Sequence, residues 1–158
     1  MNYLIFRIRK YLSEEDTFWM FALIIESYMP PDYYVEMYGA KTHATILVKT
    51  LIQYNYLPDV LQAFTKLDYP IVSFGCKFFI TIFTENLPEQ LSFRVLDLFF
   101  LTGMQSNKII FDVSLAYLRV LEPQIVACDD LSHINKIINP DNKVFLDTNR
   151  FMREIEKA

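Results

Sequence analysis

Proline residues at positions 30–31, 58, 88 and 123 divide this chain into segments of helix length. Proline lacks a backbone donor and clashes with the preceding turn, so each one marks a helix end or a first helical turn. Between the prolines, apolar residues recur at three- and four-residue intervals, as in Phe18, Phe21 and Ile25. No alternating run is framed by Asn-Gly or Asp-Gly turns, which would indicate strands. The pattern predicts an all-α fold, an antiparallel array of about eight or nine helices.

Local signals place several helix ends. Ser13 precedes Glu14, Glu15 and Asp16, a combination typical of an N-cap followed by an acidic first turn. A short helix over 32–38 is expected to stop at Gly39. A helix over 88–101 is apolar almost all round, which favours a place in the middle of a bundle. Beyond Pro123 the sequence predicts two weaker helices, about 124–138 and 141–156.

The apolar content is high for a single small domain. Apolar residues make up 53% of the 158 residues and aromatic residues 16%, whereas ordinary domains have about 45–50% apolar residues. One core can accommodate a chain of this length. The surplus of Phe and Tyr has two interpretations, a dense core or a surface that another protein covers.

Charge and hydropathy exclude other classes. The net charge is −4 and no basic stripe occurs, so we expect no nucleic-acid partner. The longest apolar run, Phe18–Ile25, is far short of the roughly 20 residues that span a bilayer, so no transmembrane segment is predicted. Residues 1–12 are basic and free of acids, as transit peptides are, but a structural helix is favoured. Cys76 and Cys128 lack disulfide or zinc spacing, which favours a reducing compartment.

No pattern of catalytic residues emerges. His43 and His133 lie near no nucleophile in a known motif, and their separation matches no metal site. Acidic clusters such as Asp129–Asp130 are better explained by the helix dipole than by acid–base chemistry. Three isolated glycines cannot form a phosphate loop. We therefore predict no catalytic residue, cofactor or metal site, and a chain that is not an enzyme.

Arg94 and Asp97 are the strongest polar candidates. They are three residues apart within the apolar segment 88–101, so they can meet on one helix face. A buried charged pair is either a functional site or a structural lock between helices. The structural role is favoured, and losing one partner of such a pair costs about 3–5 kcal/mol.

Three stretches in this order resemble the C-terminal half of a TBC domain, the helical domain of Rab GTPase-activating proteins. They read EEDTFWMFALIIESYMPPDYY (14–34), CKFFITIFTENLP (76–88) and RVLDLFFLTG (94–103). The resemblance covers 13–138, preceded by an N-terminal helix (1–12) and followed by a C-terminal helix (139–158) in a single domain.

The resemblance assigns structural roles to six residues. Phe18 and Trp19 match the family's Phe-Trp pair, and Arg94 and Asp97 match its Arg-x-x-Asp. The family usually has Trp where this sequence has Phe78 and Leu96, exchanges that keep the apolar class.

Two motifs of the family are missing from the 158 residues. TBC domains supply a Rab GTPase with the arginine of I-x-x-D-x-x-R and the glutamine of Y-x-Q, and both precede the Phe-Trp helix. Only seventeen residues precede Phe18, and neither motif occurs among them or later. An arginine finger stabilises charge on the transferred phosphoryl group. No catalytic residue can therefore be carried over from the family.

The resemblance leaves three functions open. The leading hypothesis is a non-catalytic TBC-like interaction module, an obligate subunit held to other proteins by about 2,000 Å² or more of buried surface. The alternatives are part of a Rab GTPase-activating protein whose catalytic half is missing or supplied by another chain, and a Rab-binding module without activity. The expected compartment is intracellular, with cytoplasmic (vesicle or ciliary) and mitochondrial contexts both open.

Overall fold

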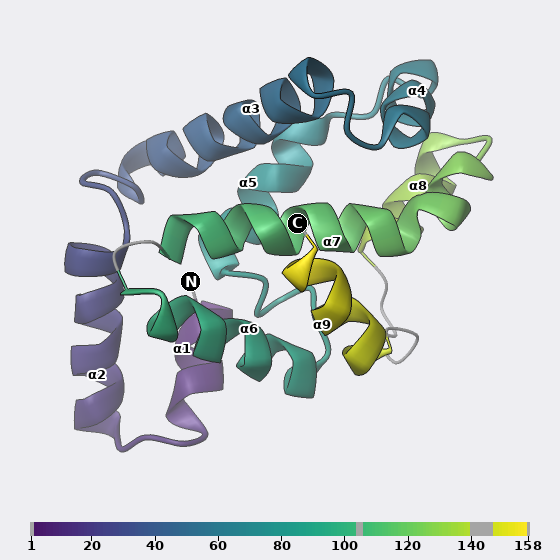
Figure 1. Ribbon diagram of the computed structural model, residues 1–158. Helices are drawn as coiled ribbons and strands as arrows, with labels where there is room; N and C mark the ends of the chain where they lie inside the picture. The colour runs from purple at the N-terminus through teal and green to yellow at the C-terminus, as the bar shows by residue number, and fades with distance from the viewer. Residues whose placement is uncertain (1, 104–105, 140–146, 158) are drawn as a thin grey trace.

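The computed structural model describes residues 2–103, 106–139 and 147–157, and regular secondary structure in these ranges is entirely helical (Figure 1). This confirms the all-α array, which is formed in this part of the chain by nine α-helices and two short helical turns. The elements are α1 (Asn2–Arg9), α2 (Glu14–Leu23), the π-helix η1 (Ile24–Tyr28), the 3₁₀ turn η2 (Val35–Met37), α3 (Tyr38–Gln53), α4 (Pro58–Lys66), α5 (Ile71–Thr81), α6 (Glu89–Leu101), α7 (Ser106–Val126), α8 (Leu131–Ile138) and α9 (Thr148–Glu156).

Helix α5 lies between α3 and α7 (Figure 1). Gly75 of α5 faces Ala44 of α3, and a Cβ atom on Gly75 would lie only 2.8 Å from the Cβ atom of Ala44. The missing side chain therefore allows the two helices to approach closely. Two small residues in contact give tight backbone packing, which is the reason why this glycine stands inside a helix despite its cost in helix propensity.

Aromatic rings fill the space between α5 and α7. The ring of Phe78 lies with its centroid 5.0 Å from that of Tyr117 and 4.3 Å from that of Phe74. The Tyr117 hydroxyl donates a hydrogen bond of 2.7 Å to the carbonyl oxygen of Ile138, which ties α7 to the end of α8. Burial raises the pKa of Tyr117, so this phenol remains a neutral donor. The dense core that the aromatic content suggested is therefore present.

The expected break at Pro123 is wrong. Helix α7 continues through Pro123 to Val126, and a separate α8 follows, instead of one helix over 124–138. Leu121 and Ile125, on either side of the proline, are fully buried. Proline in the last turn interrupts the backbone hydrogen-bond ladder only near its end, and burial of the flanking side chains offsets that loss.

The expected helix over 32–38 is also wrong. This segment forms turns and the short η2, and Gly39 is the second residue of α3, not a helix stop. Glu36 and Met37 have φ values of 46° and 60°, left-handed conformations that interrupt a helix. Gly39 is needed for space, because a Cβ atom there would lie 2.3 Å from Cδ2 of the buried Tyr33.

Helix α9 packs on α7 through Phe151 and Ile155, both buried. Arg119 of α7 forms an ion pair of 3.5 Å with Glu154. The first part of the expected helix 141–156, residues 141–146, lies outside the described residues. No helix in the described ranges is both long and apolar enough to cross a membrane.

His43 of α3 is enclosed by aromatic rings. Its ring centroid lies 5.2 Å from that of Tyr33, 5.3 Å from that of Phe111 and 6.1 Å from that of Phe79. Its Nδ1 atom is buried without a hydrogen-bond partner in the described part of the protein. Removal from water disfavours the imidazolium and lowers the pKa of His43 below its usual range.

Acid should destabilise the fold through His43. The folded state binds a proton at His43 less readily than the unfolded state does. The contribution of neutral His43 to the free energy of unfolding is therefore complete above about pH 6.5, and it falls as the pH drops toward the depressed pKa of the folded state. We expect chemical unfolding of His43→Phe to depend less on pH between 7 and 5 than that of the unsubstituted protein. His133→Gln, at the exposed second histidine, is the control, and equal changes in the two variants would contradict the assignment.

Candidate interaction surface

Helix α2 has an apolar sequence but little burial. Of its ten residues only Thr17 is buried. Phe18 and Trp19 are 63% and 62% exposed, and Leu23 is 42% exposed. A helix that is apolar around most of its circumference is normally enclosed by other helices. The outer side of α2 is instead an apolar surface that nothing covers within the described residues.

The start of α2 is rigidly defined. The Ser13 hydroxyl accepts a hydrogen bond of 3.1 Å from the backbone N–H of Asp16 and donates one of 2.7 Å to its carboxylate, which confirms the expected N-cap. The Thr17 hydroxyl donates to the Ser13 carbonyl oxygen at 2.7 Å. With the helix phase set here, Phe18 and Trp19 point outward and contact each other edge to face, with centroids 5.2 Å apart.

The other end of α2 is anchored to the core by a π-helical turn. Ile24, at the start of η1, is fully buried, and Tyr28 at its end stacks on Phe99 of α6 with centroids 5.5 Å apart. A π-turn adds a residue to the helical repeat and is frequent at functional sites. Here the π-turn changes the direction of the side chains that follow Leu23, so that Tyr28 reaches α6. Trp19, which precedes the turn, stays exposed.

Helix α1 packs beside α2, and ion pairs attach it to α6. Leu4 and Ile8 are buried. Arg7 and Lys10 both reach one carboxylate oxygen of Glu89, at 2.9 and 2.6 Å. The hydrogen bond from Lys10 holds the pKa of Glu89 below its usual range, with further help from the charges of Lys10 and Arg7. The basic residues of the N-terminal segment thus belong to a helix that is bound to the core.

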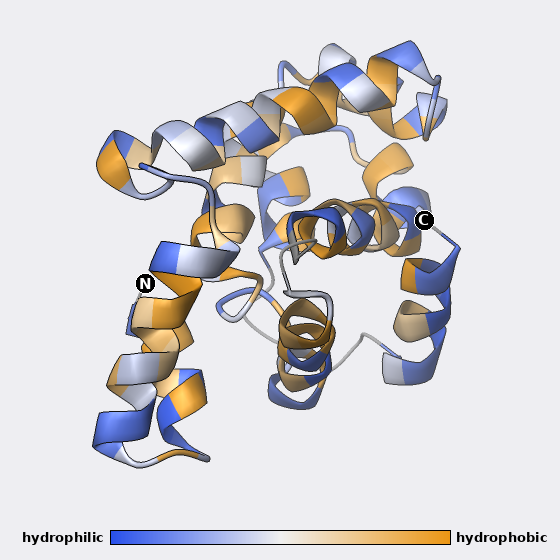
Figure 2. Ribbon diagram, turned by 60° about the vertical axis from the view of Figure 1, so that its left-hand side comes forward, coloured by the Kyte–Doolittle hydropathy of each residue, from blue (hydrophilic) through white to orange (hydrophobic). Residues whose placement is uncertain are grey.

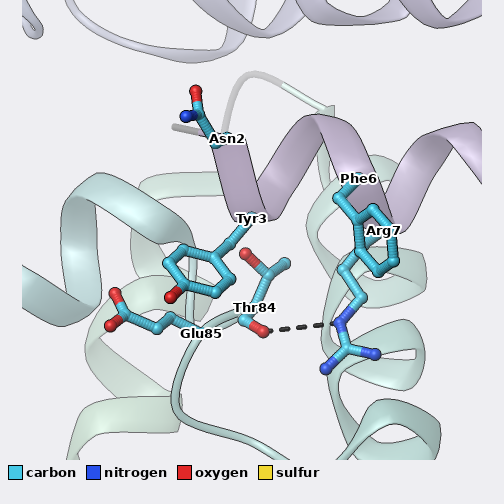
Figure 3. A pocket seen from close by; sticks show the side chains of 6 residues that line it. All are labelled: Asn2, Tyr3, Phe6, Arg7, Thr84 and Glu85. Carbon is cyan, nitrogen blue, oxygen red and sulfur yellow. Dashed lines mark hydrogen bonds between the residues drawn. The ribbon is translucent and has the colours of Figure 1, made fainter.

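Together, α1 and α2 form a hairpin that stands out from the rest of the protein, with apolar stretches on both helices (Figure 2). Tyr3 and Phe6 of α1 are 53% and 61% exposed. They line an open groove of about 500 Å³ beside the turn at Thr84–Glu85. In Figure 3 the ring of Tyr3 extends over Glu85, and Arg7 donates to the Thr84 carbonyl oxygen at 3.4 Å. Tyr3 and Phe6 thus form an aromatic wall of this groove.

A second, smaller cleft of about 200 Å³ lies between α1, α2 and α6. Its walls are apolar apart from Asp97. The structure corrects the expectation of a buried Arg94–Asp97 pair, because both side chains are exposed and no ion pair joins them among the described residues. They lie on the outer face of α6, near the 82%-exposed Leu101. Helix α6 has a solvent face because it is an edge of the array next to the hairpin.

The remaining candidates divide between core and surface. Phe78 and Leu96 are buried, at 1% and 3% exposure. Phe18 and Trp19 lie on the surface described above. The sequence does not identify Tyr3 and Phe6 as surface residues, because apolar residues at helical spacing predict a core face whether or not another element covers it. Nothing in the sequence alone distinguishes the two cases.

The histidines and cysteines of the described residues lie in contrasting environments. His43 is enclosed among rings, and His133 is exposed on α8. Burial raises the pKa of both cysteine thiols, which weakens their nucleophilicity. In the described ranges no three His, Cys, Asp or Glu residues gather closely enough to hold a metal ion.

Comparison with known proteins gives a consistent result. The family model of the Rab-GTPase-TBC domain matches residues 1–126. A TBC domain-containing protein from Schizosaccharomyces pombe is 28% identical over 149 residues, 94% of this chain and 19% of that protein. TBC1 domain family member 2B from mouse is 28% identical over 145 residues, covering 90% and 14%. Human small G protein signaling modulator 3 is 28% identical over 125 residues, covering 78% and 16%.

The chain thus spans less than a fifth of the length of these relatives. Among solved structures, the crystal structure of the Chlamydomonas flagellar RabGAP TBC domain superposes with a TM-score of 0.76 at 22% identity. The match covers 92% of this chain and 46% of that one. The fold is therefore shared with slightly less than half of that chain.

The exposure of Phe18 predicts a contrast in stability. Phe78→Ala should lower the free energy of unfolding by about 3–5 kcal/mol because it leaves a cavity among packed rings. Phe18→Ala should change it by no more than about 0.5 kcal/mol, as exposed substitutions usually do. Urea unfolding of both variants at high dilution measures the two values. A loss at Phe18 as large as that at Phe78 would show that Phe18 is part of the core.

Asp97 gives a second test. With its carboxylate exposed, Asp97→Ala should leave the unfolding free energy within about 0.5 kcal/mol of the original, not the several kcal/mol that a buried pair would require. Thermal and urea unfolding of the isolated chain measure the change. Arg94→Ala is the matched variant, and a large loss at either position would restore the buried-pair interpretation.

Proposed function

Because this chain belongs to the Rab-GTPase-TBC domain family, we propose that it acts as a non-catalytic TBC-type module, an interaction subunit of a larger protein assembly. It works by presenting apolar side chains of the α1–α2 hairpin to another polypeptide. It does not supply groups to a phosphoryl-transfer reaction.

The observation that carries this proposal is the exposure of Phe18 and Trp19 on a helix with a single buried residue. Leaving side chains of this size in water forfeits about 1.5–3 kcal/mol each relative to burial. Large aromatic residues, Trp above all, are the side chains that dominate binding energy at protein interfaces. A partner that covers the outer side of α2 would recover this energy.

Neither finger motif occurs among the 158 residues. The one Asp-x-x-Arg in the sequence is Asp147–Arg150, preceded by Val144 where the family motif has Ile. Asp147 is the N-cap of α9, and its carboxylate accepts a hydrogen bond of 2.8 Å from the Arg150 backbone N–H. A capping role explains the spacing of these two residues without any contribution to catalysis.

The alternative function is a share in Rab GTPase activation, with the catalytic half of the domain provided by other residues or another chain. The 46% coverage of the flagellar RabGAP TBC domain favours this alternative, because a half-length match leaves room for a complementary half. A Rab-binding module without activity is the third candidate. It would bind a Rab GTPase in one nucleotide state and leave the hydrolysis rate unchanged.

A GTP-hydrolysis assay on a panel of Rab GTPases separates these functions. We expect single-turnover rates with this chain to equal the intrinsic rates, because neither finger motif occurs among its 158 residues. An arginine finger would accelerate hydrolysis by about 10³–10⁵-fold. A complete TBC domain is the positive control. Acceleration by this chain alone would refute the proposal, and loss of that acceleration in Arg150→Ala but not in Arg153→Ala would identify the arginine responsible.

A further inference from the structure

The two helices of the hairpin differ sharply in charge. Residues 1–10 contain Arg7, Arg9 and Lys10 and no acid. Residues 11–40 contain six acids and no Lys or Arg, and three of the acids form the first turn of α2. A basic helix and an acidic helix therefore stand side by side on a projecting element.

These charges are only partly neutralised within the molecule. Arg7 and Lys10 share Glu89 of α6. The exposed Arg9 donates only to a carbonyl oxygen, that of Leu12, at 2.9 Å. Among the described residues, Glu14 and Glu15 have no cationic partner within ion-pair distance. The tip of the hairpin thus exposes one unpaired cation and two unpaired carboxylates.

Apolar residues occupy the remaining levels of the same element. Descending from the tip, α1 presents Phe6 and then Tyr3, and α2 presents Phe18 with Trp19 and then Leu23. These side chains are 42–63% exposed. Because the helices run antiparallel, positions equally far from the tip lie at equal heights. At equal distances from the tip, the two helices therefore carry complementary groups, which are opposite charges at the tip and large apolar side chains below it.

From this pattern we propose that the α1–α2 hairpin docks on the same hairpin of a second copy of this chain. The proposal rests on the interaction role proposed above and names its partner. A two-fold axis parallel to the hairpin places α1 of one copy against α2 of the other, which gives an antiparallel four-helix arrangement. Arg9 then faces Glu14 and Glu15 of the other copy. An isologous interface of this kind requires a surface that is complementary to itself.

The available surface is adequate for such a pair. Buried aromatic side chains contribute about 150–250 Å² each, so the exposed fractions of Tyr3, Phe6, Phe18 and Trp19 amount to roughly 500 Å² per copy, to which Leu23 adds a smaller share. With the charged tip included, two copies reach the roughly 1,200–2,000 Å² typical of stable interfaces.

Trp19 provides the probe, since it is the one tryptophan in the chain and lies at the proposed contact. We expect sedimentation equilibrium to show a monomer–dimer equilibrium in the micromolar range. The emission of Trp19 should shift to shorter wavelength, and iodide quenching should weaken, over the same concentrations. A chain that stays monomeric with exposed Trp19 overturns the self-pairing. The hydrolysis assay judges the non-catalytic role independently of that result.

Charge reversal tests the orientation. Arg9→Glu alone and Glu14→Lys/Glu15→Lys alone should each weaken dimerisation about tenfold or more through like-charge contacts, whereas an equal mixture of the two variants should form a heterodimer. Lys49→Glu, on the exposed outer side of α3, is the control. A dimer that neither hairpin variant weakens, or that their mixture fails to restore, contradicts this geometry.

A pair of apolar variants tests the contact itself. Phe18→Ser should abolish dimerisation in the same concentration range. Ile52→Ser changes a side chain of equal exposure, 63%, on α3 and should leave dimerisation unchanged. Equal effects of the two would indicate nonspecific apolar association and overturn the proposal. Circular dichroism of each variant confirms that it is folded.

Discussion

Helix α5 is held between two neighbours, and the rest of the array is built on that contact. On one side Gly75 allows α3 to approach through Ala44, and on the other Phe78 packs against Tyr117 of α7. Helices α4, α6, α8 and α9 each pack on α7. Because close-packed interiors tolerate neither gaps nor overlaps, the small pair on one side and the ring stack on the other fix the positions of three helices at once. The rings of Phe74, Phe78, Phe79 and Tyr117 pack at this contact.

The hairpin contributes Leu4 and Ile8 to the buried core but leaves the outer side of α2 outside it. Glu89 of α6 holds Arg7 and Lys10 of α1, and the stack of Tyr28 on Phe99 holds the end of η1. Both attachments are made to α6, an edge helix with its own exposed face. The outer side of α2 is consequently left without a neighbour. Burying it requires more protein than the described residues contain, which is the reason for the proposed role in association.

Membership of the TBC family has to be considered together with the residues that this chain exposes. TBC membership by itself suggests an activator of Rab GTPases, yet activation requires groups that project into a phosphoryl-transfer site. The described residues leave Phe18 and Trp19 exposed to solvent, at 63% and 62%. Helices α8 and α9 follow the matched region 1–126 and pack back on α7. The proposed interaction role therefore rests on the apolar surface of the hairpin.

The sequence determined the helical class, the Ser13 cap and the helix expected over 88–101, because capping and apolar periodicity act within a few residues of the chain. It failed at Pro123 and at 32–38, where burial of Leu121 and Ile125 and the space that Gly39 leaves for Tyr33 outweigh local preference. It also treated Phe18 and Phe78 alike. Only the tertiary structure separated them, and it exposed Arg94 and Asp97, because burial is decided by which helices meet. Periodicity defines a helix face, but the neighbour that covers it comes from elsewhere in the chain, or from another chain.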